Sequence, residues 1–105
     1  MFVGHGLQKD FETANIFVPP EQIRDTVELW RLPNQRKISL RFLAFYLLER
    51  RIQDEIHDSI EDAKIALFLY RKYEETLDLG AEHLSATLHQ LYQFGHKTNW
   101  TIGLS

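Results

Sequence analysis

The sequence of 105 residues lacks cysteine altogether and contains only three prolines and one methionine. Without cysteine the chain forms neither a disulfide bridge nor a zinc site with thiolate ligands, which fits a reducing compartment. Long apolar runs are missing too, because the longest, Phe42–Leu48, is far too short to span a bilayer. The first residues lack the basic stretch and apolar core of a signal peptide. We therefore expect a cytoplasmic protein without a membrane segment.

The composition that is present is that of a small globular domain. Hydrophobic residues make up 44% and charged residues 26% of the chain, as in ordinary soluble domains. The net charge of -3 gives no overall basic surface for nucleic acid. Phosphate-binding loops of the Walker type, Gly-x-Ser-x-Gly elbows and His-Glu-x-x-His motifs are all absent from the sequence. We expect a single domain over residues 1–105.

The first third of the chain predicts strands. Met1–Gly6 is a short apolar run ended by glycines, which predicts a buried strand. Leu7–Asn15 follows as a helix, before Pro19-Pro20 stops regular structure. Gln22–Leu29 is interpreted as a second strand or the end of one. The predicted fold class is therefore α/β, with most of the remaining chain helical.

Helical periodicity dominates the rest of the sequence. Ser39 is a plausible cap for a helix up to Arg50, and the last helix runs over residues 82–94, closed by Gly95. The expected inner faces of these two helices are Leu40, Leu43, Ala44, Leu47 and Leu48, and Leu84, Leu88, Leu91 and Tyr92.

The longest predicted helix lies between these two. It begins at the cap Asp58 and ends near Leu79, with Gly80 as a left-handed terminal residue. Its expected inner face consists of Ala63, Ala66, Leu67, Tyr70, Tyr73 and Leu77.

Charges are unevenly distributed. Residues 30–51 contain six basic side chains and one acid, whereas residues 54–62 contain five acids and no base. This pattern fits a phosphate-binding face beside a metal site. Equally, it fits two solvated faces that attract each other weakly.

Two places in the sequence are candidates for chemistry. Asp10 comes just after the predicted strand, where open α/β sheets bind ligands, or else it caps the following helix. Asp62 lies one turn into the longest helix, where its carboxylate can share a side with His57. That pair suits a metal ligand beside a general base; alternatively, Asp62 interacts with the helix dipole and His57 lies in a surface loop. His5 is the remaining histidine nearest to Asp10.

The order of the motifs resembles a known superfamily. Phe2-Val3-Gly4-His5-Gly6-Leu7-x-x-Asp10-Phe11, then Asp25-Thr26, then His57-x-x-x-x-Asp62-Ala63 resemble the second and third motifs of DEDD exonucleases that use histidine as base. Two further stretches, Leu69-Tyr70-Arg71-Lys72-Tyr73 and Leu91-Tyr92-x-x-Gly95-x-x-x-x-Trp100, look like the catalytic subunit of the poly(A)-binding-protein-dependent poly(A) nuclease.

This resemblance implies a fold and a set of roles. The fold is a ribonuclease H-like α/β domain, and the activity is poly(A)-specific 3′-5′ exoribonuclease action that releases 5′-AMP. Two Mg²⁺ ions are implied, with Asp10 and Asp62 among their ligands and His57 as general base. The implied partners are poly(A) RNA, the regulatory subunit of the deadenylase and poly(A)-binding protein.

One element of the family pattern has no counterpart. The Asp-x-Glu pair of the first motif belongs upstream of Asp10, and no such triplet occurs in the sequence. We expect the chain to be the carboxy-terminal part of an incomplete nuclease domain that lacks its first strands, to supply only part of the metal site and to be inactive alone. Two alternatives are a non-catalytic RNA-binding or structural remnant, and a related DEDD exonuclease with another nucleic-acid substrate.

Overall fold

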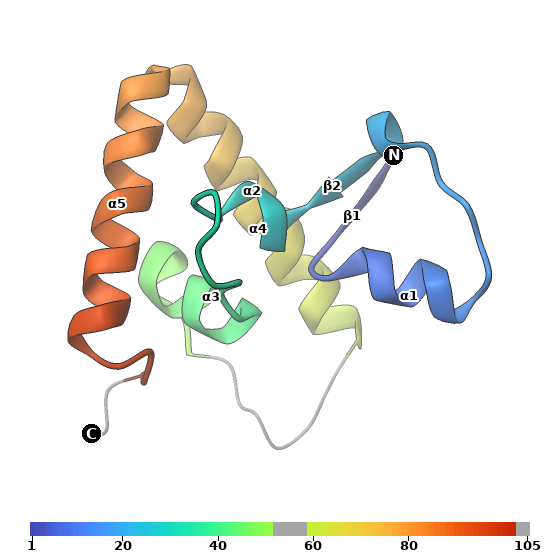
Figure 1. Ribbon diagram of the computed structural model, residues 1–105, viewed down its shortest axis with the longest axis horizontal. Coiled ribbons are helices and arrows are strands. Elements are labelled where there is room, and N and C mark those ends of the chain that lie inside the picture. Colours follow the sequence, from blue (N-terminus) through green and yellow to red (C-terminus); the bar gives the residue numbers. More distant parts are fainter. Residues whose placement is uncertain (52–58, 103–105) are drawn as a thin grey trace.

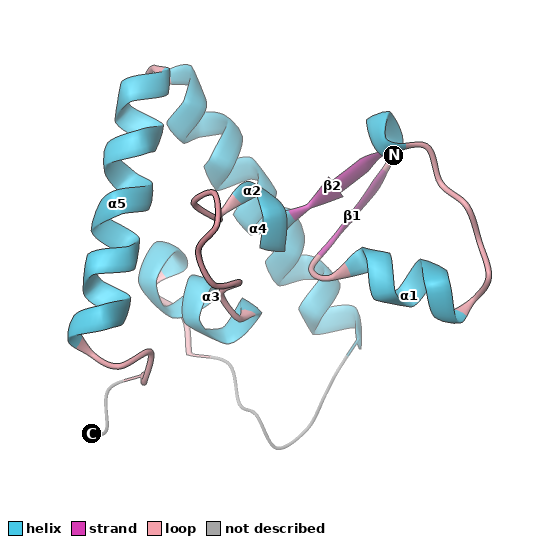
Figure 2. Cartoon of the chain, in the orientation of Figure 1, coloured by secondary structure: helices cyan, strands magenta, loops and turns pink. Residues whose placement is uncertain are grey.

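The computed structural model describes residues 1–51 and 59–102. Two short strands and six helical elements follow one another in it: β1 (Phe2–Gly4), α1 (Leu7–Thr13), η1 (Pro20–Gln22), β2 (Ile23–Asp25), α2 (Thr26–Leu29), α3 (Leu40–Leu48), α4 (Ser59–Asp78) and α5 (Ala81–Lys97). The strands and α1 lie to one side of a group formed by α3, α4 and α5 (Figure 1). Helix dominates the described chain (Figure 2). The expected helix-rich α/β class is confirmed.

The two strands pair in parallel, with Phe2 opposite Ile23 and Gly4 opposite Asp25. The connection between them contains α1, as a parallel pair requires a crossover. The prediction of a buried first strand is wrong for most of its length, because Phe2 is 46% exposed and only Gly4 is buried. Among the described residues β1 has a strand partner on one edge only.

The second strand is shorter than predicted. Gln22–Leu29 divides into β2 and the short helix α2, and the change occurs at Asp25. The carboxylate of Asp25 accepts a hydrogen bond from the backbone N–H of Val27 at 3.1 Å and so caps α2. Asp25 therefore both ends the strand, through its extended backbone, and starts the helix, through its capping side chain.

Most features predicted for α3 and α5 are confirmed. Ser39 caps α3 by accepting a hydrogen bond from Phe42 N at 3.1 Å. The predicted inner face of α5 is buried. Gly95, however, does not close this helix: it lies inside α5, buried beneath the ring of Trp100. Gly80 has a positive φ of 121°, but its ψ of 149° is not that of a left-handed helix, and it forms the N-cap of α5.

The predicted inner face of α4 is only partly correct: Ala66 is buried and Tyr73 packs against the core, as predicted. Three of its members, Ala63, Leu67 and Leu77, are exposed, whereas the structure buries Ile65, Ala66, Leu69 and Thr76. The helix carries apolar side chains on several sides, so its packing partners decide which face is buried. The indole N–H of Trp30, at the end of α2, donates to the carbonyl of Leu69 at 3.0 Å and fixes that face inward. The predicted cap Asp58 lies outside the described residues.

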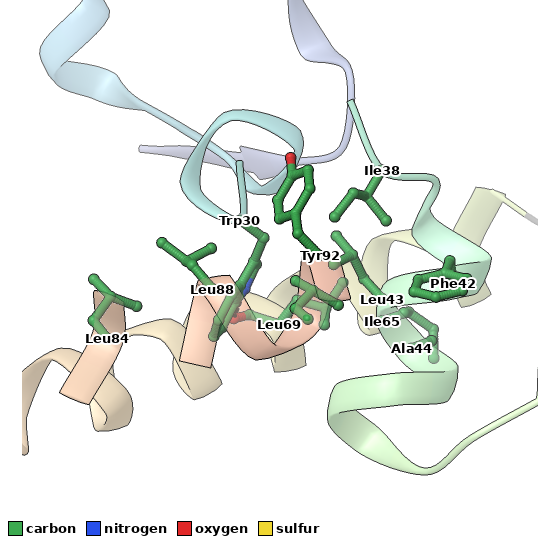
Figure 3. Packing of buried hydrophobic residues seen from close by; sticks show 11 residues of the cluster. Trp30, Ile38, Phe42, Leu43, Ala44, Ile65, Leu69, Leu84, Leu88 and Tyr92 are labelled. Carbon is green, nitrogen blue, oxygen red and sulfur yellow. Dashed lines mark hydrogen bonds between the residues drawn. The ribbon is translucent and has the colours of Figure 1, made fainter. Parts of the chain in front are cut away.

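The hydrophobic core lies between α2, α3, α4 and α5 (Figure 3). Trp30, Leu43, Leu69 and Leu91 are fully buried there. Tyr92 closes the core on one side: its hydroxyl donates to the carbonyl of Arg36 at 2.7 Å, and burial raises its pKa above the ordinary value. No helix among the described residues has both the length and the apolar character needed to cross a membrane.

Replacing Gly95 with alanine tests the contact between α5 and the chain that follows it. Gly→Ala inside a helix ordinarily stabilises by about 1 kcal/mol. Here a methyl group at residue 95 would overlap the ring of Trp100, so we expect a loss of about 1–3 kcal/mol of unfolding free energy. Thermal unfolding measures the effect, with the exposed Gln93→Ala as control on the same helix. A stabilised Gly95→Ala variant would contradict this packing.

Candidate functional site

A cavity of about 400 Å³ opens where β1 ends, and it brings two predicted site residues together. Asp10 from α1 and Asp62 from α4 both line it, although they are far apart in the sequence. Gly4 and His5 form its floor at the end of the strand, and Ser59 belongs to the first turn of α4. Leu40, the first residue of α3, lines it too, so the candidate site is built from the end of one strand and the first turns of three helices.

Asp10 lies on α1, a helix that packs only weakly against the rest of the protein. It is the fourth residue of α1, it is exposed, and no residue of α1 is buried. The N-cap of α1 is Gly6, with a φ of 77° and no capping side chain of its own. The alternative interpretation of Asp10 as the cap of this helix is therefore wrong.

Asp62 is the fourth residue of α4 and is half-buried. Its place in the first turn also lets its charge interact favourably with the helix dipole. The structure is therefore compatible with both predicted roles of Asp62, the interaction with the dipole and the binding of a metal ion. His57, the predicted general base, lies outside the described residues, as do Asp54 and Glu55 from the acidic cluster.

Asp25 lies next to the candidate site, and the sequence analysis predicts no role for it. One oxygen of its carboxylate accepts hydrogen bonds from Gly6 N at 2.8 Å and Val27 N at 3.1 Å. The other oxygen accepts one from Leu7 N at 2.9 Å. Asp25 thus joins the starts of α1 and α2. The signal available in the sequence was the Asp25-Thr26 pair, since both residue types favour helix N-caps.

His5 links the floor of the cavity to two other segments. Its Nδ1 lies 2.8 Å from the hydroxyl oxygen of Thr26, and its Nε2 lies 3.0 Å from the carbonyl of Ile38. Since a carbonyl only accepts, Nε2 carries a proton. The Thr26 hydroxyl also lies within donating distance, 3.0 Å, of the Gly4 carbonyl. In the neutral imidazole Nδ1 is an acceptor too, so Nδ1 and this carbonyl compete for one hydroxyl proton.

Burial is the main influence on the pKa of His5 and lowers it. The hydrogen bond to Ile38 and the negative charges of Asp25 and Asp62 act in the opposite direction, but more weakly. The histidine is therefore favoured in its neutral form at neutral pH, and it adds no positive charge to the cavity.

The donor set fits a divalent cation that this chain would hold only in part. The side-chain carboxylates of Asp10 and Asp62 accept no hydrogen bond from any described residue, so their carboxylate oxygens remain available. Within residues 1–51 and 59–102, no cluster of three or more acidic, histidine or cysteine side chains could hold a metal ion. Mg²⁺ is commonly bound through one or two carboxylates together with water and substrate phosphates. Two free carboxylates on one cavity meet that requirement.

Comparison with known proteins gives a consistent answer. No protein-family model matches the chain. The catalytic subunit Pan2 of the PAN2-PAN3 deadenylation complex from Rattus norvegicus is 55% identical over 103 residues, 96% of this chain but 8% of that protein. Among solved structures, the Saccharomyces cerevisiae Pan2 pseudoubiquitin hydrolase-RNA exonuclease module in complex with A7 RNA matches with a TM-score of 0.89 and 45% identity.

The match to that yeast module covers 98% of this chain and 17% of the yeast chain. The Neurospora crassa Pan2 catalytic unit, with its protease and nuclease domain, matches with a TM-score of 0.79 and 54% identity over 87% of this chain and 15% of that unit. In sequence and fold the chain is thus similar to one segment of the catalytic subunits of this deadenylation complex. Within that class it belongs to the Pan2 family, as a segment that spans less than a tenth of the length of the curated relatives.

The buried His5 predicts a pH dependence of stability. Its pKa in the folded chain lies below the ordinary value of 6.5, so the unfolded chain binds the proton more readily. The free energy of unfolding therefore falls as the pH drops below about 6.5. We expect His5→Gln to flatten the dependence of Tm on pH between about 5 and 7.5. The exposed His83→Gln serves as control, and an unchanged slope in His5→Gln would contradict the assignment.

Proposed function

We propose that this chain supplies part of the active site of a poly(A)-specific 3′-5′ exoribonuclease that shortens mRNA poly(A) tails and releases 5′-AMP. The observation that carries the proposal is the cavity at the end of β1, where Asp10 and Asp62 meet. These are the two aspartates that the DEDD motifs single out. The name of the yeast relative, an RNA exonuclease module in complex with A7 RNA, supports the same activity.

The proposed parent domain has a ribonuclease H-like fold, and residues 1–105 form its carboxy-terminal part. A parallel strand pair with a helical crossover, followed by a long helix, α4, that contacts β1, supports that assignment. Among the described residues β1 has a strand partner on one edge only, which is compatible with further strands of such a sheet.

Asp10 and Asp62 would hold Mg²⁺ in this proposal, and His57 would accept a proton from the attacking water. When bound, paired metal ions supply positive charge at the attacking and leaving oxygens of the phosphate. The chain's own contribution is to place two carboxylates on one cavity as metal ligands; without a cation they would repel each other and a polyanionic substrate. His5, neutral and hydrogen-bonded, orients the end of β1 beneath them.

The partners proposed for the complete protein follow from its relatives. The rat relative is the catalytic subunit of a complex with Pan3, so a regulatory subunit of that kind is the first proposed partner. Poly(A)-binding protein is the second. Both would act on cytoplasmic mRNA, and we propose that compartment for the protein.

A second candidate function is RNA binding without cleavage. Much of the basic stretch is engaged within the fold: Arg31 and Lys37 pair with Glu28, and Arg36 lies over the ring of Trp100. A different group of cations borders a groove of about 350 Å³ between the end of α3 and α4. It contains Arg50, stacked at 4.9 Å on Phe68, together with Arg71, Lys72 and one acid, Glu75.

The nuclease proposal predicts that the chain needs the rest of the domain. The pure chain incubated with labelled poly(A) and Mg²⁺ should release no AMP. Placed in the yeast Pan2 module in exchange for the matching segment, it should support cleavage. In that chimaera Asp10→Asn and Asp62→Asn should each lower kcat about 100-fold or more, a loss near 3 kcal/mol of transition-state stabilisation. AMP release is the measurement.

Asp78→Asn provides the matched control, because Asp78 lies at the opposite end of α4 from Asp62. Cleavage that survives both Asp10→Asn and Asp62→Asn would refute the proposed site, and AMP release by the pure chain would refute its dependence on other segments. Equal cleavage of poly(A) and poly(U) by the chimaera would favour a related exonuclease with broader specificity.

The basic groove predicts salt-dependent binding of oligo(A) by the pure chain. If Arg71 and Lys72 each contact a phosphate, the double variant Arg71→Gln/Lys72→Gln should reduce the slope of log K against log salt by about 1 to 1.5. Fluorescence anisotropy at several salt concentrations gives this slope. Lys64→Gln/Lys97→Gln removes the same charge from surfaces outside the groove and should change the slope less. Equal slopes in the two double variants would exclude the groove as the binding surface.

A further inference from the structure

The start of α1 depends on a side chain from elsewhere in the sequence. Its N-cap, Gly6, has no side chain to satisfy the unpaired N–H groups of the first turn. Two of the first backbone N–H groups, those of Gly6 and Leu7, donate instead to the two oxygens of Asp25, at 2.8 and 2.9 Å. Charge-assisted hydrogen bonds of this kind are short and strong.

Little else holds this helix in place. It has seven residues, none of them buried, and isolated helices of this length are unstable in water. The ring of Phe11 contacts that of Phe2, which is itself 46% exposed. The orientation of α1 relative to α4 is therefore set mainly at its first turn, which also carries Asp10.

Asp25 itself is firmly held. It is the last residue of β2, where it pairs with Gly4, and it caps α2 by accepting a hydrogen bond from Val27 N. The next residue, Thr26, is fully buried, and its hydroxyl donates to the Gly4 carbonyl. Three backbone N–H groups occupy most of the acceptor sites of the Asp25 carboxylate, so it is poorly placed to be a metal ligand.

We propose that Asp25 is a positioning residue: its carboxylate clamps the first turn of α1 and thereby fixes Asp10 across the cavity from Asp62. This proposal rests on the proposed function only where it concerns cation binding. The geometric part, the fixed separation of α1 and α4, stands independently of any activity.

Two substitutions separate the contributions of the clamp. Asp25→Asn keeps size and one carbonyl oxygen, but its amide N–H₂ must face one of the backbone N–H groups that the carboxylate satisfied. Asp25→Ala removes all three acceptor contacts. Glu28→Gln removes one negative charge from the neighbouring helix α2 without touching α1, because Glu28 pairs with Arg31 and Lys37.

The absence of cysteine allows a direct measurement of the geometry. Spin labels at Thr13→Cys on α1 and Lys64→Cys on α4, both exposed positions, report the distribution of distances between the two helices by pulsed electron paramagnetic resonance. We expect a narrow distribution in the parent chain and in Glu28→Gln. Asp25→Asn should broaden it, and Asp25→Ala should broaden it further, while near-ultraviolet circular dichroism of the buried Trp30 stays unchanged.

Mn²⁺ titration of the unlabelled chain gives the second readout. We expect Asp25→Ala to weaken the Asp10-dependent affinity about 10-fold, as outer-shell partners of metal ligands do, with Glu28→Gln unchanged. A narrow distance distribution in Asp25→Ala would overturn the proposal, as would a broad one with unaltered Mn²⁺ affinity or loss of the Trp30 signal in both Asp25 variants. If the parent chain shows no Asp10-dependent Mn²⁺ binding, the proposed metal site fails, and the distance distributions still decide the role of Asp25.

Discussion

The hydrogen bonds at the end of the two parallel strands are the constraint on which the rest of the structure depends. Asp25 ends β2 and Thr26 begins α2, and between them they hold the start of α1, the start of α2 and the carbonyl of Gly4. Backbone N–H groups at a helix start must find acceptors, and a buried hydroxyl must find a partner. One dipeptide meets these requirements at the point where the strand pair joins α1 and α2.

From this junction the chain continues into two regions of different character. On one side α2 leads at once to Trp30, whose indole donates to α4 and anchors the hydrophobic core. On the other side lie α1 and the cavity, where burial is slight and hydrogen bonds set the geometry. Removing apolar area from water stabilises the first region, whereas directional contacts position Asp10 in the second. Local opening is therefore expected to be easiest at α1.

The sequence predicted the elements better than their faces. Helical periodicity located α3, α4 and α5, and the cap at Ser39 followed from its hydroxyl. The inner face of α4 was predicted only in part because apolar side chains occur on several of its sides and the contact from Trp30, distant in the chain, selects one. Gly95 was predicted to end a helix, but it is a glycine because the ring of Trp100 leaves no room for a side chain at this position. In both cases a contact far along the chain overrode a local pattern.

The order of the motifs in the sequence was enough to predict that Asp10 and Asp62 belong to one site. Asp10 and Asp62 do meet at one cavity, but their spacing in the sequence gives no distance. What the sequence could not separate was the role of each acid. The structure separates them by their hydrogen bonds: three backbone N–H groups occupy the Asp25 carboxylate, whereas the carboxylates of Asp10 and Asp62 accept none from the described residues.

This difference has a general physical basis. A carboxylate saturated by backbone donors stabilises the chain that surrounds it and has little left to offer a cation. A carboxylate without donors keeps its charge unsatisfied, and a second such group across a cavity repels it until a cation is present. The arrangement at the end of β1 thus places one acid that holds the backbone directly behind another that is free to bind. The first makes the position of the second independent of whether a cation is there.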